Sequence, residues 1–149
     1  INSIILYISI EIMITKKIQE FKLKSFKKKS GKLIPIEFKK NFRMTAKRIF
    51  YIYGNKNKRR GDHAHKKCSQ IFIPILGKTE LKIKSLTMSK KIILNHKKST
   101  AVLIPPKYWC GLNFLNSNTI VMVICDYNYD FNDYIEKFSE YKKYMERNK

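Results

Sequence analysis

Short apolar runs separated by polar turns dominate the chain from Ile18 onward. The runs are of strand length and rich in β-branched and aromatic side chains. Turn-forming residues separate them, as at Gly77-Lys78 and Pro105-Pro106. The pattern predicts strands at residues 33–38, 48–53, 63–66, 70–76, 79–86, 91–94, 101–104 and 119–125.

Strands of this length at roughly ten-residue spacing are typical of an all-β fold, either an antiparallel sandwich or a barrel. Strands and helices do not alternate along the chain, so the pattern gives no indication of a parallel sheet. Residues 54–61, polar with a glycine at each end, are predicted to form a loop, and Gly77 is predicted to form a hairpin turn. The 149 residues are enough for one domain with one core, which we place at residues 13–149.

One helix is expected, at the C-terminus. Asp133 is a suitable N-cap, and Glu136 stands three residues later, as in a capping box. Apolar residues recur at helical spacing at Tyr134, Phe138, Tyr141 and Met145. We expect this stripe to pack on the barrel or on a partner subunit.

Charge changes this picture little. Lysine and arginine number 32 against 11 acidic residues, which gives a formal charge of +21 at pH 7. The basic residues are mostly lysines spread along the chain, whereas readers of nucleic acid depend on arginine, so we expect no nucleic-acid partner. The positive field would still attract a small anion such as a nucleotide diphosphate.

The cysteines and the N-terminal segment bear on the compartment. Cys68, Cys110 and Cys125 are too few and too irregularly spaced for a disulfide framework, which favours a reducing cytoplasm. The apolar run 1–10 is too short for a membrane span, and we expect no membrane partner. Because the first methionine is Met13, we interpret residues 1–12 as upstream or expression-derived sequence.

The densest chemical signal is the segment GDHAHKKCSQ, residues 61–70. In a strand, His63 and His65 point to the same face, and their ring nitrogens need partners if they are buried. Their spacing to Gln70 and Gly77 resembles the first metal-binding motif of cupins, with glutamine in place of glutamate. Cys110 follows a proline where the second cupin motif has a histidine. This set suits iron or manganese poorly, and of the metals zinc or copper would suit it best; we expect no metal.

A more specific resemblance extends over residues 18–145. It is carried by the segments RIFYI (48–52), RGDHAHKK (60–67), PKYW (106–109) and DYI (133–135), in this order. They resemble the sugar-nucleotide 3,4-ketoisomerases of the WxcM-like branch of cupins. The resemblance implies a cupin-type antiparallel jelly roll with one C-terminal helix, assembled as a homodimer.

The same resemblance implies the function. Such an enzyme moves the ketone of thymidine diphosphate-4-keto-6-deoxyglucose from C4 to C3 without metal or cofactor. The product would serve a pyridoxal-phosphate aminotransferase that makes a 3-amino sugar for surface polysaccharide such as the O-antigen of lipopolysaccharide. Histidine suits the chemistry, because a pKa near ~6.5 allows one group to remove and return a proton.

The resemblance also implies site residues. His63 and His65 are the acid and base candidates, with their separate roles left open. We expect substrate contacts from Arg48, Arg60, Lys66, Gln70, Tyr108, Trp109 and Cys110. Arg48 shares a strand face with Phe50 and Ile52, opposite to Tyr51, and we expect that face to point inward. Cys110 departs from the histidine that relatives commonly have, which leaves the configuration at C4, galacto or gluco, open.

Three other functions remain possible from the sequence. A non-catalytic jelly roll that binds a nucleotide sugar needs no acid–base pair. A 3-epimerase of the same 4-keto sugar also removes the C3 proton but returns it to C3 from the other side. A lysine-dependent nucleic-acid binder would show steeply salt-dependent binding.

Overall fold

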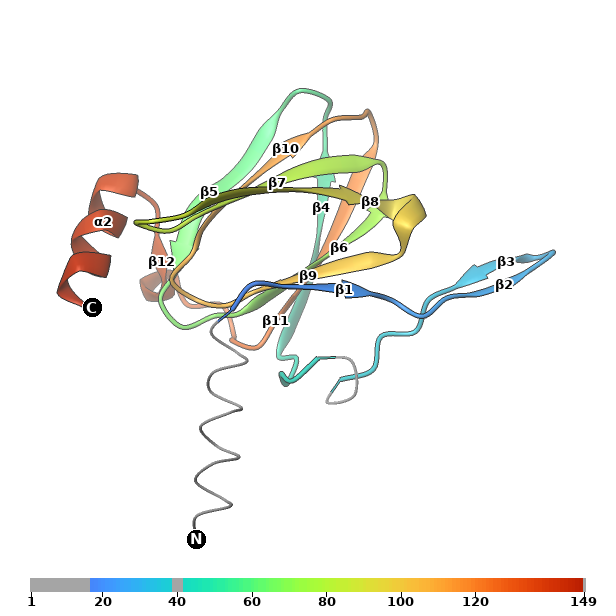
Figure 1. Cartoon of the computed structure of the whole chain (residues 1–149), viewed down its shortest axis with the longest axis horizontal. Helices are drawn as coiled ribbons and strands as arrows, with labels where there is room; N and C mark the ends of the chain where they lie inside the picture. Colours follow the sequence, from blue (N-terminus) through green and yellow to red (C-terminus); the bar gives the residue numbers. More distant parts are fainter. Residues whose placement is uncertain (1–16, 39–41, 149) are drawn as a thin grey trace, which may run out of the picture.

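Two five-stranded antiparallel sheets face each other in the computed structural model, which describes residues 17–38 and 42–148 (Figure 1). The first sheet contains β1 (Gln19–Lys22), β9 (Thr100–Ile104), β6 (Gln70–Leu76), β11 (Thr119–Cys125) and β4 (Arg48–Gly54), in that spatial order. The second contains β12 (Tyr134–Ile135), β5 (Arg59–His65), β10 (Trp109–Phe114), β7 (Lys78–Lys84) and β8 (Ser89–Asn95). This arrangement confirms the predicted jelly roll.

Outside the two sheets lie a hairpin and three short helical segments. The hairpin pairs β2 (Phe26–Lys28) with β3 (Gly31–Leu33) and extends away from the sheets (Figure 1). Two 3-10 turns, η1 (His96–Lys98) and η2 (Phe131–Asp133), join strands, and α2 (Phe138–Arg147) follows β12. Within the described residues, α2 is the only α-helix.

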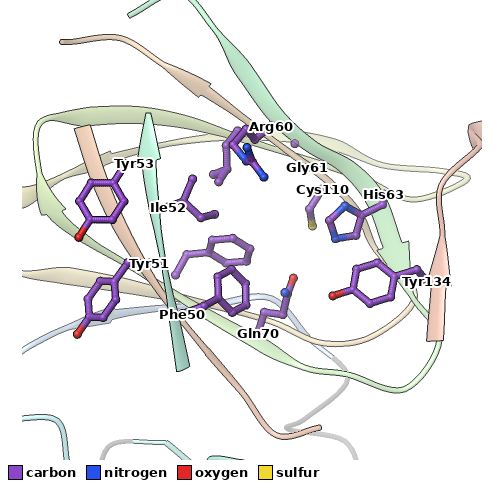
Figure 2. Close-up of a pocket in the computed structure, with 13 residues that line it drawn as sticks. Phe50, Tyr51, Ile52, Tyr53, Arg60, Gly61, His63, Gln70, Cys110 and Tyr134 are labelled. Atoms are coloured by element: carbon purple, nitrogen blue, oxygen red, sulfur yellow. The ribbon is translucent and has the colours of Figure 1, made fainter. Parts of the chain in front are cut away.

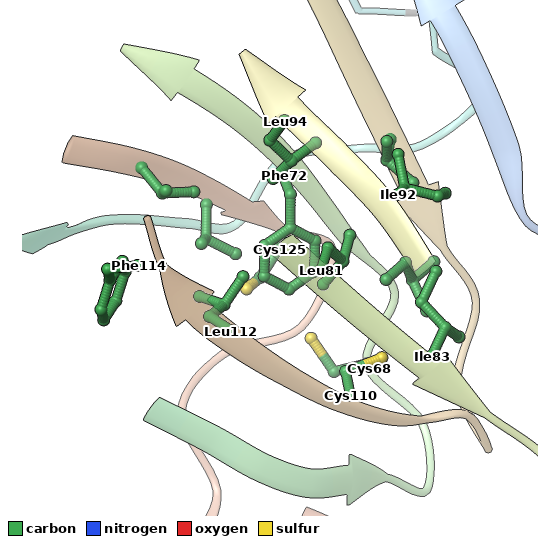
Figure 3. Packing of buried hydrophobic residues seen from close by; sticks show 14 residues of the cluster. Cys68, Phe72, Leu81, Ile83, Ile92, Leu94, Cys110, Leu112, Phe114 and Cys125 are labelled. Atoms are coloured by element: carbon green, nitrogen blue, oxygen red, sulfur yellow. The ribbon is translucent and has the colours of Figure 1, made fainter. Parts of the chain in front are cut away.

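A cluster of buried apolar side chains from both sheets packs between them (Figure 3). Leu81 and Ile83 of β7 face Val121 and Val123 of β11, and all four side chains are fully buried. Alternation of buried and exposed positions along β7 matches a strand with one face in the core. The sequence pattern predicted this strand correctly because its period of two is a local property.

The C-terminal helix begins later than predicted. Asp133 ends η2 and Tyr134 lies in β12, so neither belongs to the helix; Lys137 is the N-cap, without a side-chain capping bond. Tyr141 is fully buried and donates a hydrogen bond of 2.9 Å to the Lys107 carbonyl. The predicted apolar stripe therefore packs on the barrel from Phe138 onward.

Three further expectations need correction. Gly77 does not form a hairpin turn, because β6 and β7 belong to different sheets; with φ of 76°, it carries the chain from one sheet to the other. The predicted strand 33–38 is wrong beyond Leu33, where β3 ends. The predicted loop 54–61 is shorter, since β5 begins at Arg59, and strand β10 was not predicted at all.

Residues 1–12 lie outside the described residues. In the described part of the chain, no helix has both the length and the apolar character needed to span a membrane.

Candidate active site

A cavity of about 490 Å³ lies between the two sheets, a size that accommodates a small-molecule ligand (Figure 2). Its walls come from β4 and β6 of one sheet and from β5, β10 and β12 of the other. The lining residues are Phe50, Tyr51, Ile52, Tyr53, Arg60, Gly61, His63, Gln70, Phe72, Cys110, Gly111, Leu112 and Tyr134. The rings of Tyr51 and Tyr53 point away from the cavity (Figure 2), whereas Phe72 and Leu112 also belong to the core.

The two histidines lie side by side at the end of β5, as predicted. Their ring centroids are 5.0 Å apart, with the planes at 79°. His63 lines the cavity, and His65 is buried beside it with 4% of its surface exposed. A ligand in the cavity would therefore meet His63 directly and His65 just behind it.

A β-bulge determines which other residues of β5 reach the cavity. In the pairing of β5 with β10, His63 lies opposite Cys110 and Gly61 opposite Gly111, so Asp62 has no partner. Gly61 and Asp62 both have positive φ, 86° and 54°. One extra residue reverses the alternation, and consequently Arg60 and His63, three positions apart, both line the cavity.

His65 is oriented by a buried carboxylate that the sequence analysis took for a helix cap. His65 Nδ1 lies 2.7 Å from Asp133 Oδ2, and Asp133 Oδ1 accepts a hydrogen bond of 2.6 Å from the Lys67 amide. Both side chains are at most 5% exposed. The carboxylate fixes the ring and favours the tautomer with its proton on Nδ1, which leaves Nε2 with a lone pair.

Burial governs the protonation of both imidazoles. It lowers the pKa of His63 and that of His65 from the ordinary value, and the hydrogen bond that His65 donates to Asp133 partly offsets the effect on the pKa of His65. Neutral rings are therefore favoured at neutral pH. A neutral imidazole can accept a proton from a substrate.

Tyr134 is a second residue that the sequence analysis missed as part of the site. Its ring packs against His63 and His65, at centroid distances of 5.0 and 4.3 Å. Its hydroxyl accepts a hydrogen bond of 3.5 Å from Arg48 Nη2. The DYI segment (133–135) carries part of the family resemblance, and that resemblance is the sequence signal for both Asp133 and Tyr134.

Arg48 points between the sheets, as expected, but it is not among the residues that line the cavity and contacts the Cys125 thiol and Tyr134 instead. Its Nη2 lies 3.7 Å from Cys125 Sγ, and Gln70 Nε2 lies 3.8 Å from the same sulfur. Interaction with the Cys68 thiol is the largest cause that lowers the pKa of Cys125, to about 6; burial opposes it and the contact with Arg48 adds to it. The same interaction, together with burial, raises the pKa of Cys68. A thiolate at Cys125 would neutralise the Arg48 guanidinium beneath the cavity.

The other predicted site residues divide into two groups. Arg60, Gln70 and Cys110 line the cavity, and burial raises the pKa of Cys110, which keeps it a neutral thiol. The remaining three lie elsewhere: Lys66 Nζ donates to the Asn132 carbonyl, Tyr108 lines a second hollow, and Trp109 packs on α2.

The cupin-type ligand set is not assembled. His63, His65 and Cys110 do not form a cluster at ligand distance in the described part of the chain. The Cys110 thiol instead donates to the Tyr108 carbonyl at 3.8 Å. The residues present therefore do not fit the metal of the metal-binding cupins.

These features define the class of the protein, a cupin-type jelly roll with a cavity between its sheets and two adjacent histidines at the cavity wall. The family model described as WxcM-like, C-terminal (FdtA) matches residues 16–146. The chain therefore belongs to the WxcM-like family of sugar-nucleotide 3,4-ketoisomerases.

Individual relatives agree with this assignment. The chain is 31% identical over 130 residues to TDP-4-oxo-6-deoxy-alpha-D-glucose-3,4-oxoisomerase of Aneurinibacillus thermoaerophilus, covering 85% of this chain and 93% of that one. It is also similar to a variant of the 3,4-ketoisomerase QdtA from Thermoanaerobacterium thermosaccharolyticum solved with TDP-4-keto-6-deoxyglucose, with a TM-score of 0.82, 29% identity, and coverage of 87% and 94%. A 3,4-ketoisomerase from Helicobacter canadensis gives a TM-score of 0.83 at 27% identity, with coverage of 87% and 98%.

Proposed function

We propose that this enzyme moves the ketone of thymidine diphosphate-4-keto-6-deoxyglucose from C4 to C3 by histidine-mediated proton transfer through an enediolate. The observation that carries the proposal is the contact between His63, on the cavity wall, and His65, held by Asp133. The substrate class is that named for the relatives in Aneurinibacillus and Thermoanaerobacterium.

The reaction is a balanced double proton shift. A neutral imidazole removes the C3 proton, and the electron pair of the C–H bond forms the enediolate double bond between C3 and C4. A proton then returns to C4, while the hydroxyl at O3 loses its proton and O4 gains one, so that no electrons are exchanged with a cofactor. We assign contact with the reacting carbons to His63, because it lines the cavity, and support of the hydroxyls to His65.

The surrounding groups suit an anionic intermediate. Arg60 is on the cavity wall, and the Tyr134 hydroxyl is held by Arg48. A guanidinium stabilises an enediolate or a pyrophosphate by charge-assisted hydrogen bonds. A ketone at C3 is the group that a pyridoxal-phosphate aminotransferase converts to an amine, so we place this enzyme before such a step in 3-amino sugar formation.

Nuclear magnetic resonance in deuterated buffer tests the proposal. Chelator-treated enzyme should move the carbonyl of the 4-keto nucleotide sugar to C3 and leave deuterium at C4, and the coupling of neighbouring protons will give the configuration of the product. Replacing His63 or His65 with Asn should lower kcat by about 10²–10⁴-fold.

The control is His96→Asn, because this histidine lies in η1 with its Nδ1 3.1 Å from the Gly77 carbonyl. It should retain wild-type activity. If the protein binds the nucleotide sugar but leaves it unchanged, the protein is a binding module and not an isomerase. Deuterium at C3 with the ketone still at C4 would identify a 3-epimerase.

A further inference from the structure

Beside the cavity lies a cluster of metal-ligand side chains, formed by His65, Cys68 and Asp133. One potential ligand atom of each lies within 4.8 Å of the other two. All three residues are buried, and within the described ranges no other trio of histidine, cysteine, aspartate or glutamate is grouped in this way. His65 ends β5, Cys68 lies in the connection from β5 to β6, and Asp133 ends η2.

The chemistry of the three ligands selects the kind of ion. A thiolate, an imidazole and a carboxylate are all zinc ligands, whereas magnesium and calcium prefer oxygen alone. Two residues separate Cys68 from His65, within the two to four residues that separate paired cysteine ligands in structural zinc sites. Zinc with one thiolate and one carboxylate is electrically neutral, which limits the cost of burying the ion.

His65 can release the nitrogen that faces Asp133. Zinc would take Nδ1, which lies 2.7 Å from Asp133 Oδ2, in place of the hydrogen bond between them. The ring proton would then move to Nε2, which is buried and has no hydrogen-bond partner within the described residues. Tetrahedral zinc holds its ligand atoms roughly 3.5 Å apart, and the three candidate atoms already lie within 4.8 Å of one another. Cys125 stays outside the set, because its sulfur is already contacted by Arg48 and Gln70.

We propose that His65, Cys68 and Asp133 form an inhibitory site for a zinc ion. Binding replaces the Cys68 thiol proton with a zinc–sulfur bond and releases that proton to solvent, while the imidazole coordinates in its neutral form without any redox change. Coordination removes His65 from the pair that it forms with His63 and replaces its hydrogen bond to Asp133. The loss of activity on binding rests on the proposed function, but the binding itself does not.

Metal titration of the chelator-treated full chain tests the site. Wild-type protein should bind one equivalent of Zn²⁺ with release of one proton, and Co²⁺ should produce a near-ultraviolet thiolate-to-metal charge-transfer band. Cys68→Ser should abolish the band and weaken Zn²⁺ binding by at least ~100-fold, since loss of a ligand exceeds the effect of losing an outer-shell partner. Cys110→Ser is the matched control and should retain both the Zn²⁺ affinity and the charge-transfer band of the wild-type protein.

Activity provides the second measurement. One equivalent of Zn²⁺ should inhibit isomerisation by wild type, excess chelator should restore it, and Cys68→Ser should resist inhibition in proportion to its lost affinity. Binding without any isomerase activity in the metal-free protein would refute the proposed function and leave the site standing. Absence of stoichiometric binding, or a charge-transfer band that survives in Cys68→Ser, would overturn the zinc site.

Discussion

At the residue scale, the site depends on a hydrogen bond between side chains 68 positions apart, His65 Nδ1 to Asp133 Oδ2. The HxH spacing located the imidazoles because same-face projection is a property of any strand. Asp133 could not be recognised in the same way. An aspartate before an apolar run reads equally well as a helix N-cap, and only the pairing of β12 with β5 brings it to His65.

Asp133→Asn tests this positioning role in the chelator-treated enzyme. The amide presents a donor to Nδ1 and so favours the opposite tautomer, and kcat should fall by about 10²–10⁴-fold with little change in KM. Asp133 raises the pKa of His65, so its removal should lower that pKa further and move the acid limb of the pH–rate profile to lower pH.

The matched control is Asp130→Asn, because Asp130 caps η2 through the Asn132 amide and asparagine can do the same. It should behave like wild type. An unchanged kcat and an unmoved acid limb in Asp133→Asn would show that the carboxylate does not act through His65.

At the scale of elements, the bulge in β5 determines the composition of the cavity wall. Strict alternation would place Arg60 and His63 on opposite faces, and the structure places both on one. Alternation along β10 has a complementary effect: Cys110 faces the cavity while its neighbour Trp109 packs on α2. The prediction that Trp109 and Cys110 both contact substrate is wrong for Trp109 in this structure, because neighbouring residues of an unpredicted strand point to opposite faces.

Gly61→Ala tests the bulge. Gly61 has φ of 86°, and an added Cβ would lie 3.2 Å from the Cys110 carbonyl oxygen, so we expect a loss of about 1–2 kcal/mol of stability. The strain acts on the bulge that directly precedes His63 and orients its side chain toward the cavity. Because misorientation of a catalytic group slows the reaction, kcat should also fall by at least ~10-fold.

Gly77→Ala provides a control with the same kind of strain. Its φ is 76°, and its Cβ would lie 2.8 Å from Thr119 Oγ1, between β6 and β7. Thermal unfolding should show a similar loss in both variants, whereas only Gly61→Ala should lose kcat. Equal kcat in the two would argue against a role of the bulge in aiming His63.

At the scale of the whole molecule, one surface remains apolar. The outward-facing side chains Ile49, Tyr51 and Tyr53 of β4 are 53%, 55% and 74% exposed, and β4 is an edge strand. Exposed apolar rows on sheet edges are typical of subunit contacts. A second copy of the chain packed on this face would cover these apolar side chains and form the homodimer that the family resemblance implies.

Light scattering after size-exclusion chromatography tests that dimer. Wild type should elute at twice the mass of one chain, and Ile49→Lys/Tyr53→Lys should shift the protein toward monomer, because buried lysines oppose association. Ile93→Lys, which changes an exposed apolar residue of β8, is the control and should remain dimeric. A monomeric wild type would exclude the dimer.

The sequence by itself determined most strands, the adjacency of His63 and His65, and the inward direction of Arg48, because each follows from the alternation of side chains along a strand. The tertiary structure alone decided which carboxylate orients His65, which residues the bulge turns toward the cavity, and where Trp109 packs. These depend on contacts between strands far apart in the sequence, and local pattern carries no information about such pairing.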